Sequence, residues 1–200
     1  MFRLSRIVFS FKVPLSAVPS FVLLVAGLCA TPLIWAVATP TFVLKDLVTG
    51  QTTPVTVGEL ARLRVYVFLS SKCPCSIDHQ ETLRKLATTY ASEVEFVGIN
   101  SNGDEPFERS ANHFSKVRFP FPVLRDEGAQ LANHFGAVKT PHVYVVDRKG
   151  ALVYQGGIDN SHEAGRASEH YLEAVLTAVH AGKAPPYTEK RTLGCAIKRP

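Results

Sequence analysis

Residues 64–76 read RVYVFLSSKCPCS, and this stretch decides the fold. Its first six residues are apolar, β-branched or aromatic apart from Arg64, which is typical of a buried strand. Pro74 fits the first turn of a helix, where the missing amide hydrogen costs nothing. The stretch therefore predicts a strand that turns directly into a helix, with Cys73 and Cys75 at the turn.

Strands and helices alternate along the rest of the chain. Apolar spacing predicts one helix that starts at residues 73–75 and ends near Ala91. Strands are expected at 41–44 and 94–99, helices at 105–116, 129–135 and 168–181, an extended segment at 119–124, a hairpin at 142–154, a turn at 46–53 and a short helical turn at 57–60. This order predicts an α/β fold, with a central mixed sheet flanked by helices.

The first forty residues have a different composition. Residues 13–39 contain no charged side chain, and they follow the basic residues Arg3, Arg6 and Lys12. A basic flank before an apolar run is typical of a membrane anchor or of a secretory signal, with cleavage in this case near Ala38. Both alternatives predict a hydrophobic helix at the N-terminus. Both also predict a domain that is exported to the periplasmic side of the cell envelope, with membrane contact through this segment.

Composition and length divide the chain into three parts. We expect a signal or anchor at residues 1–40, one globular domain at 41–182, and a tail at 183–200 that carries Cys195. The hydrophobic fraction of 46% suits a packed core. The net charge of +5 is scattered without a basic stripe, which argues against a nucleic-acid partner.

The cysteine turn suggests thiol chemistry. Thiolate is the reactive form of cysteine, and a helix N-terminus together with Lys72 should lower the pKa of Cys73. Cys75 is the first candidate for a disulfide partner, although the short Cys-x-Cys ring would be strained. Cys195 is the second candidate, if the tail folds back. In an oxidising compartment cysteines tend to form disulfides, and three cysteines cannot all be paired within one chain. At least one thiol is therefore unpaired or takes part in disulfide exchange.

A metal site is the alternative use of the same residues. Cys75 and His79 lie four apart, on one face of the predicted helix, so Cys73, Cys75 and His79 offer three ligands suited to copper or zinc. The simpler interpretation is that His79 is a surface histidine. We predict no metal and no cofactor, with copper as the alternative.

Several separated stretches resemble the redoxin branch of the thioredoxin-like superfamily, the alkyl hydroperoxide reductase and thiol-specific antioxidant family. The stretches that carry the resemblance occur in the family's order: residues 67–74, 96–102, 121–126, 135–137, 140–141, 157–159 and 194–198. The resemblance implies a thioredoxin-like fold for residues 41 to 200. It also implies that Pro141 is the cis-proline beside the reactive cysteine, where its missing amide leaves room for a substrate chain.

The chain departs from two motifs of its superfamily. Ser76 stands where thioredoxins carry the second cysteine of Cys-x-x-Cys. Tyr66 stands where peroxiredoxins carry the proline of their active-site motif, and Thr140-Pro141 replaces their arginine. An arginine there would stabilise the transition state of peroxide reduction, so its absence argues against the peroxidase alternative.

The sequence therefore predicts an exported thiol–disulfide oxidoreductase. Cys73 would attack a disulfide, Cys75 or Cys195 would resolve the mixed disulfide, and Pro141 would shape the docking groove. The expected partners are protein or small-molecule disulfides and a thiol reductant. One alternative is a thiol peroxidase that reduces hydroperoxides through Cys73. The other is a copper-delivery protein that resembles Sco-type chaperones and uses Cys73, Cys75 and His79.

Overall fold

The computed structural model describes residues 39–199 of the 200-residue chain. The predicted signal or anchor at residues 13–39, its cleavage site and the N-terminal hydrophobic helix fall almost wholly outside this range. Within the described part of the chain, no helix combines the length and the apolar character that a membrane crossing requires.

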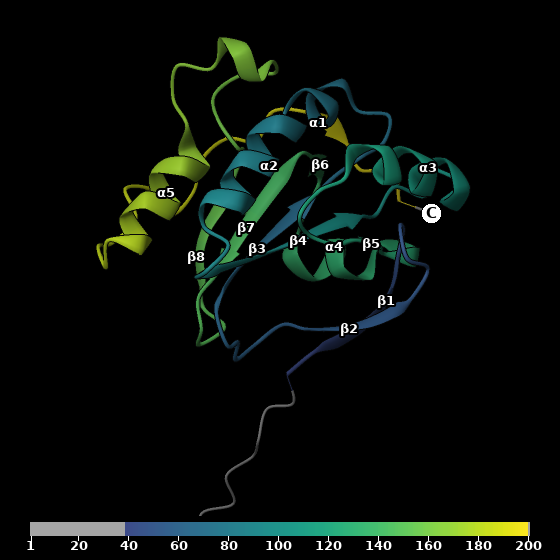
Figure 1. Cartoon of the computed structure of the whole chain (residues 1–200), viewed down its shortest axis with the longest axis horizontal. Helices are drawn as coiled ribbons and strands as arrows, with labels where there is room; N and C mark the ends of the chain where they lie inside the picture. The colour runs from purple at the N-terminus through teal and green to yellow at the C-terminus, as the bar shows by residue number, and fades with distance from the viewer. Residues whose placement is uncertain (1–38, 200) are drawn as a thin grey trace, which may run out of the picture. The chain divides into compact units, whose positions relative to one another are not determined.

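A seven-stranded mixed sheet forms the centre of the domain, as the sequence predicted. The strand order is β2-β1-β5-β4-β3-β7-β8, with β3, β4 and β5 parallel and the outer pairings antiparallel. Figure 1 shows β3 and β4 side by side near the middle of the sheet. The strands are β1 (Thr41–Asp46), β2 (Thr52–Thr56), β3 (Leu63–Phe68), β4 (Val94–Asn100), β5 (Val123–Arg125), β7 (His142–Val146) and β8 (Leu152–Gly156).

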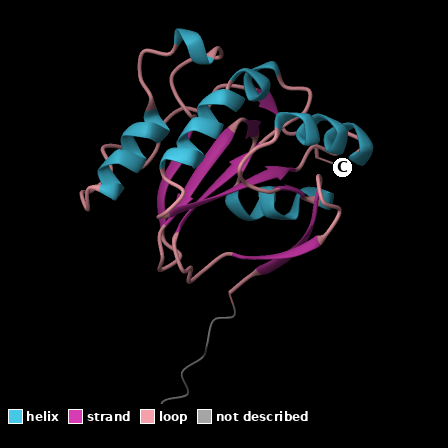
Figure 2. Cartoon of the chain, in the orientation of Figure 1, coloured by secondary structure: helices cyan, strands magenta, loops and turns pink. Residues whose placement is uncertain are grey.

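Helices cover both faces of this sheet (Figure 2). Alternate side chains of β3 point to opposite faces because the side-chain period of a strand is two. Val65 and Val67 pack with α2 (Gln80–Thr89), α3 (Phe107–Val117) and α5 (Tyr171–His180). Tyr66 and Phe68 pack with α4 (Gln130–Phe135), which ends at Gly136 in the left-handed conformation. Both faces of the central strand are thus fully buried.

The helix that follows the cysteine turn is shorter than predicted. It consists of α1 (Pro74–Asp78) and α2, which are separated at His79. The His79 ring bonds back to the Cys75 carbonyl oxygen and across to Asp159, so this residue is held by contacts that helical spacing does not show. The predicted continuous helix was therefore wrong at one residue.

Three other local predictions were wrong. The polar stretch 46–53 includes a turn, but it continues into β2, and β1 and β2 form a hairpin. Pro54 is tolerated in this strand because β2 lies at the edge of the sheet. Residues 57–60 form a bend and no helix, held by a hydrogen bond from Leu60 N to Arg148 O of 2.9 Å. Helix α5 begins at Tyr171, three residues later than expected.

Candidate active site

The cysteine turn lies at the carboxyl end of β3. Cys73 caps the N-terminus of α1, and Ile77 N donates to its carbonyl oxygen at 3.0 Å. The side chain of Cys73 is 2% exposed, and its Sγ donates a hydrogen bond to Thr140 O at 3.0 Å. The peptide bond between Thr140 and Pro141 is cis. The fold therefore brings Cys73 and the Thr140–Pro141 step together across 67 residues of sequence.

The C-terminal tail returns to the same place. Strand β9 (Cys195–Ala196) pairs antiparallel with β6 (Lys139–Thr140), and Cys195 lies opposite Thr140. In Figure 1 the short yellow arrow of β9 lies close to α1 and to β6. Gly194 makes this approach possible, because a Cβ there would lie 2.1 Å from Thr140 O. The sequence offered the tail only as a possible partner, and it predicted neither strand of this pair.

The pairing brings Cys195 next to Cys73, and both residues line one small cavity. Burial raises the pKa of Cys73, but hydrogen bonds from the Cys195 thiol and from the amides of Ser76 and Cys195 outweigh burial and lower the pKa overall. Burial and the charge of Cys73 raise the pKa of Cys195. Cys73, Cys75 and Cys195 are free thiols in this structure. The geometry thus favours Cys73 as the thiolate and Cys195 as its protonated neighbour.

Lys72 does not have the predicted role beside Cys73. Its Nζ donates to the carbonyl oxygen of Asp104 at 2.7 Å and approaches the Asp104 carboxylate at 3.1 Å. Hydrogen-bond donors of Ser76 and Cys195 therefore stabilise the thiolate, while the ammonium group pairs with a neighbouring acid.

Cys75 faces a different part of the site. It is half-buried, and its Sγ lies 3.3 Å from Nδ1 of His162, in the loop that follows β8. Burial, followed by the charge of Cys73, raises the pKa of Cys75. Cys75 is thus near Cys73 but less ready to ionise.

A buried carboxylate, Glu105, supports the turn from below. It is 1% exposed, and it accepts hydrogen bonds from the Ser70 hydroxyl and, at 2.9 Å, from the Ser71 amide. Ser70 Oγ in turn accepts a hydrogen bond from the Cys73 amide at 3.0 Å. Glu105 therefore holds the backbone of Cys73 in place through Ser70. The remaining donors to Glu105 are the hydroxyls of Ser71 and Ser110 and the side-chain amide of Asn100.

Burial raises the pKa of Glu105, but these hydrogen bonds lower it by a larger amount. The net pKa therefore lies below its ordinary value. The sequence analysis had placed Glu105 at the start of a helix, with no role. The signal in the sequence was weak: Glu105 follows Asp104 at the end of the loop after the second parallel strand.

His79 is buried, at 1% exposed, so the interpretation as a surface histidine was wrong. Its Nδ1 lies 2.7 Å from Cys75 O and its Nε2 lies 3.0 Å from Asp159 Oδ2. Burial lowers the pKa of His79, whereas Asp159 and the Cys75 carbonyl raise it, with a net increase.

Both ring nitrogens of His79 are thus engaged away from the thiols. Among residues 39–199, no cluster of three or more His, Cys, Asp or Glu side chains could hold a metal ion. The structure does not assemble the copper ligand set Cys73, Cys75 and His79.

A small cavity of about 120 Å³ opens beside the nucleophile. Cys73, Cys195, Lys72, Asn102 and Glu105 are among the residues that line it. Two buried polar atoms near this site have no hydrogen-bond partner within the described range: Asn102 Nδ2, and Thr140 Oγ1. The Thr140 hydroxyl lowers the pKa of Cys73.

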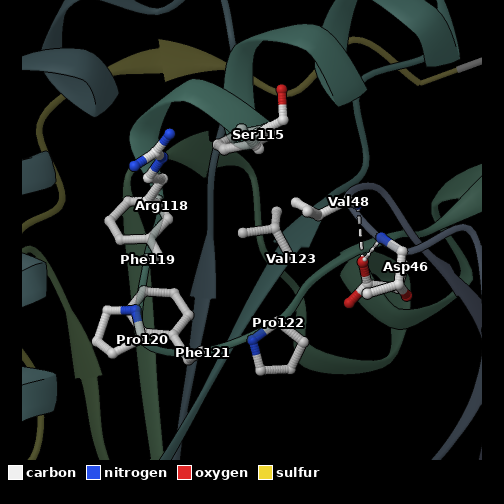
Figure 3. A pocket seen from close by; sticks show the side chains of 11 residues that line it. Asp46, Val48, Ser115, Arg118, Phe119, Pro120, Phe121, Pro122 and Val123 are labelled. Atoms are coloured by element: carbon white, nitrogen blue, oxygen red, sulfur yellow. Dashed lines mark hydrogen bonds between the residues drawn. The ribbon is translucent and has the colours of Figure 1, made fainter.

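A separate hollow of about 510 Å³ lies at the end of α3 (Figure 3). The rings of Phe119 and Phe121 stack there with centroids 4.5 Å apart, below Arg118, while Asp46 and Val48 lie across the hollow. No cysteine lines it. The thiol chemistry of the described residues is therefore confined to the cysteine turn and the tail.

Comparison with known families identifies the fold. The Redoxin family pattern matches residues 18–176. The chain belongs to the Redoxin family. The resemblance that the sequence motifs indicated is thus confirmed, as is the thioredoxin-like α/β fold with a central mixed sheet.

Two solved structures are similar to this chain over most of their length. An uncharacterised conserved protein from Geobacillus kaustophilus is 29% identical with a TM-score of 0.72, and covers 81% of this chain and 90% of its own. A hypothetical protein from Sinorhizobium meliloti is 30% identical with a TM-score of 0.70, at 81% and 92% coverage.

A putative thioredoxin from Neisseria meningitidis shares the fold. It is 17% identical with a TM-score of 0.55, and covers 72% of this redoxin and 87% of its own chain. A comparison with curated protein sequences found no match.

Proposed function

We propose that this redoxin is a thiol–disulfide oxidoreductase in which Cys73 is the nucleophile and Cys195 the resolving thiol. The observation that carries the proposal is the β6–β9 pairing, which places Cys195 opposite Thr140, the residue that accepts the hydrogen bond from Cys73 Sγ. It is supported by the lowered pKa of Cys73 and the raised pKa of Cys195, because the thiolate is the attacking form. The family match is consistent with redox chemistry at this turn.

The reaction transfers two electrons to the substrate. The Cys73 thiolate attacks one sulfur of a disulfide, a new S–S bond forms, and the other sulfur leaves as a thiolate that takes up a proton. Cys195 then loses its proton and attacks Cys73 Sγ, which expels the second substrate thiolate and leaves a Cys73–Cys195 disulfide. An external thiol reductant restores both thiols.

Cys195 is preferred over Cys75 for two reasons. The β6–β9 pairing fixes Cys195 opposite Thr140, the residue whose carbonyl oxygen accepts the hydrogen bond from Cys73. Cys75 contacts His162, and it is two residues from Cys73 in the first turn of α1, where closing the short ring would distort the helix.

Three single substitutions test this assignment. Disulfide reduction should cease in Cys73→Ser, whereas Cys195→Ser should accumulate a mixed disulfide between Cys73 and the substrate. Cys75→Ser is the matched control, and it should complete the cycle. Full activity in Cys73→Ser would refute the proposal, and a mixed disulfide trapped by Cys75→Ser in place of Cys195→Ser would refute the resolving role.

We further propose that the domain is exported, supported by the uncharged run at residues 13–39 after three basic residues. Whether this run is retained as an anchor or cleaved near Ala38 is decided by the N-terminal sequence of the mature protein.

A further inference from the structure

The short strand beside Cys73 is already paired. An extended polypeptide binds an exposed strand by adding a strand of its own, with affinity from main-chain hydrogen bonds. The strand beside Cys73 is β6, which ends at the Thr140–Pro141 step and lies in a two-stranded sheet separate from the central one. Strand β9 of the same chain pairs with it, so that Cys195 lies opposite Thr140 and Ala196 opposite Lys139. The tail presents its own cysteine where a bound polypeptide would present one.

Contacts on both sides hold the tail in this place. Ile197 is 5% exposed, and its amide donates to Val138 O at 2.9 Å. The carbonyl oxygen of Lys198 accepts a hydrogen bond from the Gly103 amide at 2.6 Å, and the amide of Lys198 donates to Asn102 Oδ1 at 3.0 Å. A polypeptide disulfide would have to displace all of these contacts before its main chain could reach β6.

The space that the tail leaves beside Cys73 is small. The cavity has a volume of about 120 Å³. It has room for a small group next to the sulfur, and β9 occupies the position beside β6 that an extended backbone would take.

The wall of this cavity offers a hydrogen-bond donor. Asn102 is 3% exposed, and its Nδ2 has no acceptor within residues 39–199. The acidic residues of the wall are engaged, because Glu105 accepts five hydrogen bonds and Asp104 pairs with Lys72. A buried unpaired donor is costly, so an acceptor oxygen that enters the cavity would be bound favourably.

We infer that the substrate is a low-molecular-weight disulfide that carries a carboxylate near its sulfur, and that β9 excludes polypeptide disulfides. This inference rests on the proposed function. Cys73 attacks the substrate sulfur that enters the cavity, the first small thiolate leaves to solvent and takes up a proton, and the carboxylate of the retained half pairs with Asn102. Attack by Cys195 on Cys73 Sγ then expels the second small thiolate without movement of β9 away from β6.

The test compares three probes with the reduced full chain: cystine, cystamine, which lacks the carboxylates, and a disulfide-bonded peptide. Rates are measured by alkylation of the remaining Cys73 thiol and mass spectrometry. We expect cystine to react at least about tenfold faster than the other two, the factor that corresponds to about 1.4 kcal/mol.

Asn102→Asp, which keeps the acceptor for Lys198, should slow the reaction of cystine about tenfold and leave the rate of cystamine unchanged. Asn112→Asp, on the exposed surface of α3, is the matched charge control.

A second variant tests the exclusion of polypeptides. Ile197→Asp should release the tail and speed the reaction of the peptide about tenfold. If that variant does not fold, hydrogen exchange of the Ile197 amide in the wild type gives the answer, because this amide should stay protected during the reaction with cystine. Equal rates for peptide and cystine with the Ile197 amide protected would overturn the inference, as would an unchanged cystine rate in Asn102→Asp. A Cys73→Ser variant that reduces all three probes at the wild-type rate, measured as the small thiol or peptide thiol released, would overturn the proposed function as well.

Discussion

Replacement of Glu105 by Gln should destabilise the domain by about 3–5 kcal/mol. The carboxylate accepts five hydrogen bonds, and a hydrogen bond to a charged group contributes about 1.5–3 kcal/mol. Serine hydroxyls can rotate to other acceptors, and Asn100 Nδ2 keeps the carbonyl oxygen of Leu69 at 3.2 Å. The Ser71 amide has no such freedom. Glutamine would also direct its own NH₂ at these donors, so about two charged hydrogen bonds are lost outright.

Chemical denaturation at neutral pH measures this loss, with Glu108→Gln as the control because Glu108 is close in sequence and exposed in the first turn of α3. The control should cost less than about 1 kcal/mol, the usual contribution of an acid in a first helical turn. The alkylation rate of Cys73 should change in Glu105→Gln as well, because Ser70 loses the acceptor that orients it toward the Cys73 amide.

The pH dependence follows from the sign of the pKa shift. The pKa of Glu105 is lowered in the folded state, so its stabilisation is complete above the ordinary value of 4.5 and is lost as the pH falls through the lowered pKa. The difference between wild type and Glu105→Gln should therefore shrink in acid. If the free energies of unfolding of wild type and Glu105→Gln agreed within about 0.5 kcal/mol at pH 7, the role assigned to this carboxylate would be refuted.

Three further predictions concern the same region. Thr140→Val should raise the pKa of Cys73, so that the pH profile of its alkylation moves to higher pH, whereas Thr140→Ser keeps the hydroxyl and should leave the profile in place. The pKa of His79 is raised by Asp159, so the stabilisation from this pair is complete below the ordinary value of 6.5 and is lost as the pH rises through the raised pKa; melting curves of wild type and His79→Gln should converge at alkaline pH. Gly194→Ala should detach β9, because φ is +144° and the new Cβ would lie 2.1 Å from Thr140 O; hydrogen exchange of the tail amides measures this, and unchanged protection would contradict it.

Local patterns were enough to predict most of the fold. The apolar run that ends at Leu69, followed by Pro74, predicted the strand-to-helix turn, and the hairpin of β7 and β8 was expected from its turn residues. The polar stretch around Gly50 predicted only a turn, and the pairing of β2 with β1 at the sheet edge is not visible in that local pattern. The break at His79 depends on Asp159, which lies 80 residues away.

The candidate site was predicted only in part, for the same reason. Cys73 and Pro141 stood out as local motifs, but the choice between Cys75 and Cys195 depends on a two-residue strand pairing that has no periodicity. Glu105 and Asn102 belong to no motif in this chain. Their proposed roles follow from burial and from hydrogen bonds to residues distant in the sequence, which a pattern of neighbours does not encode.

The return of the tail to β6 connects the redox state to the stability of the whole domain. A bond between Cys73 and Cys195 closes a loop of about 120 residues, and loop-closure entropy for such a length corresponds to roughly 4–5 kcal/mol. The oxidised protein should therefore melt at a higher temperature than the reduced one. By the same thermodynamic cycle, the energy with which folding holds the two thiols together makes the disulfide harder to reduce, at about 30 mV for each 1.4 kcal/mol. Substitutions in the distant core that loosen the fold would then change how strongly this protein oxidises or reduces its partners.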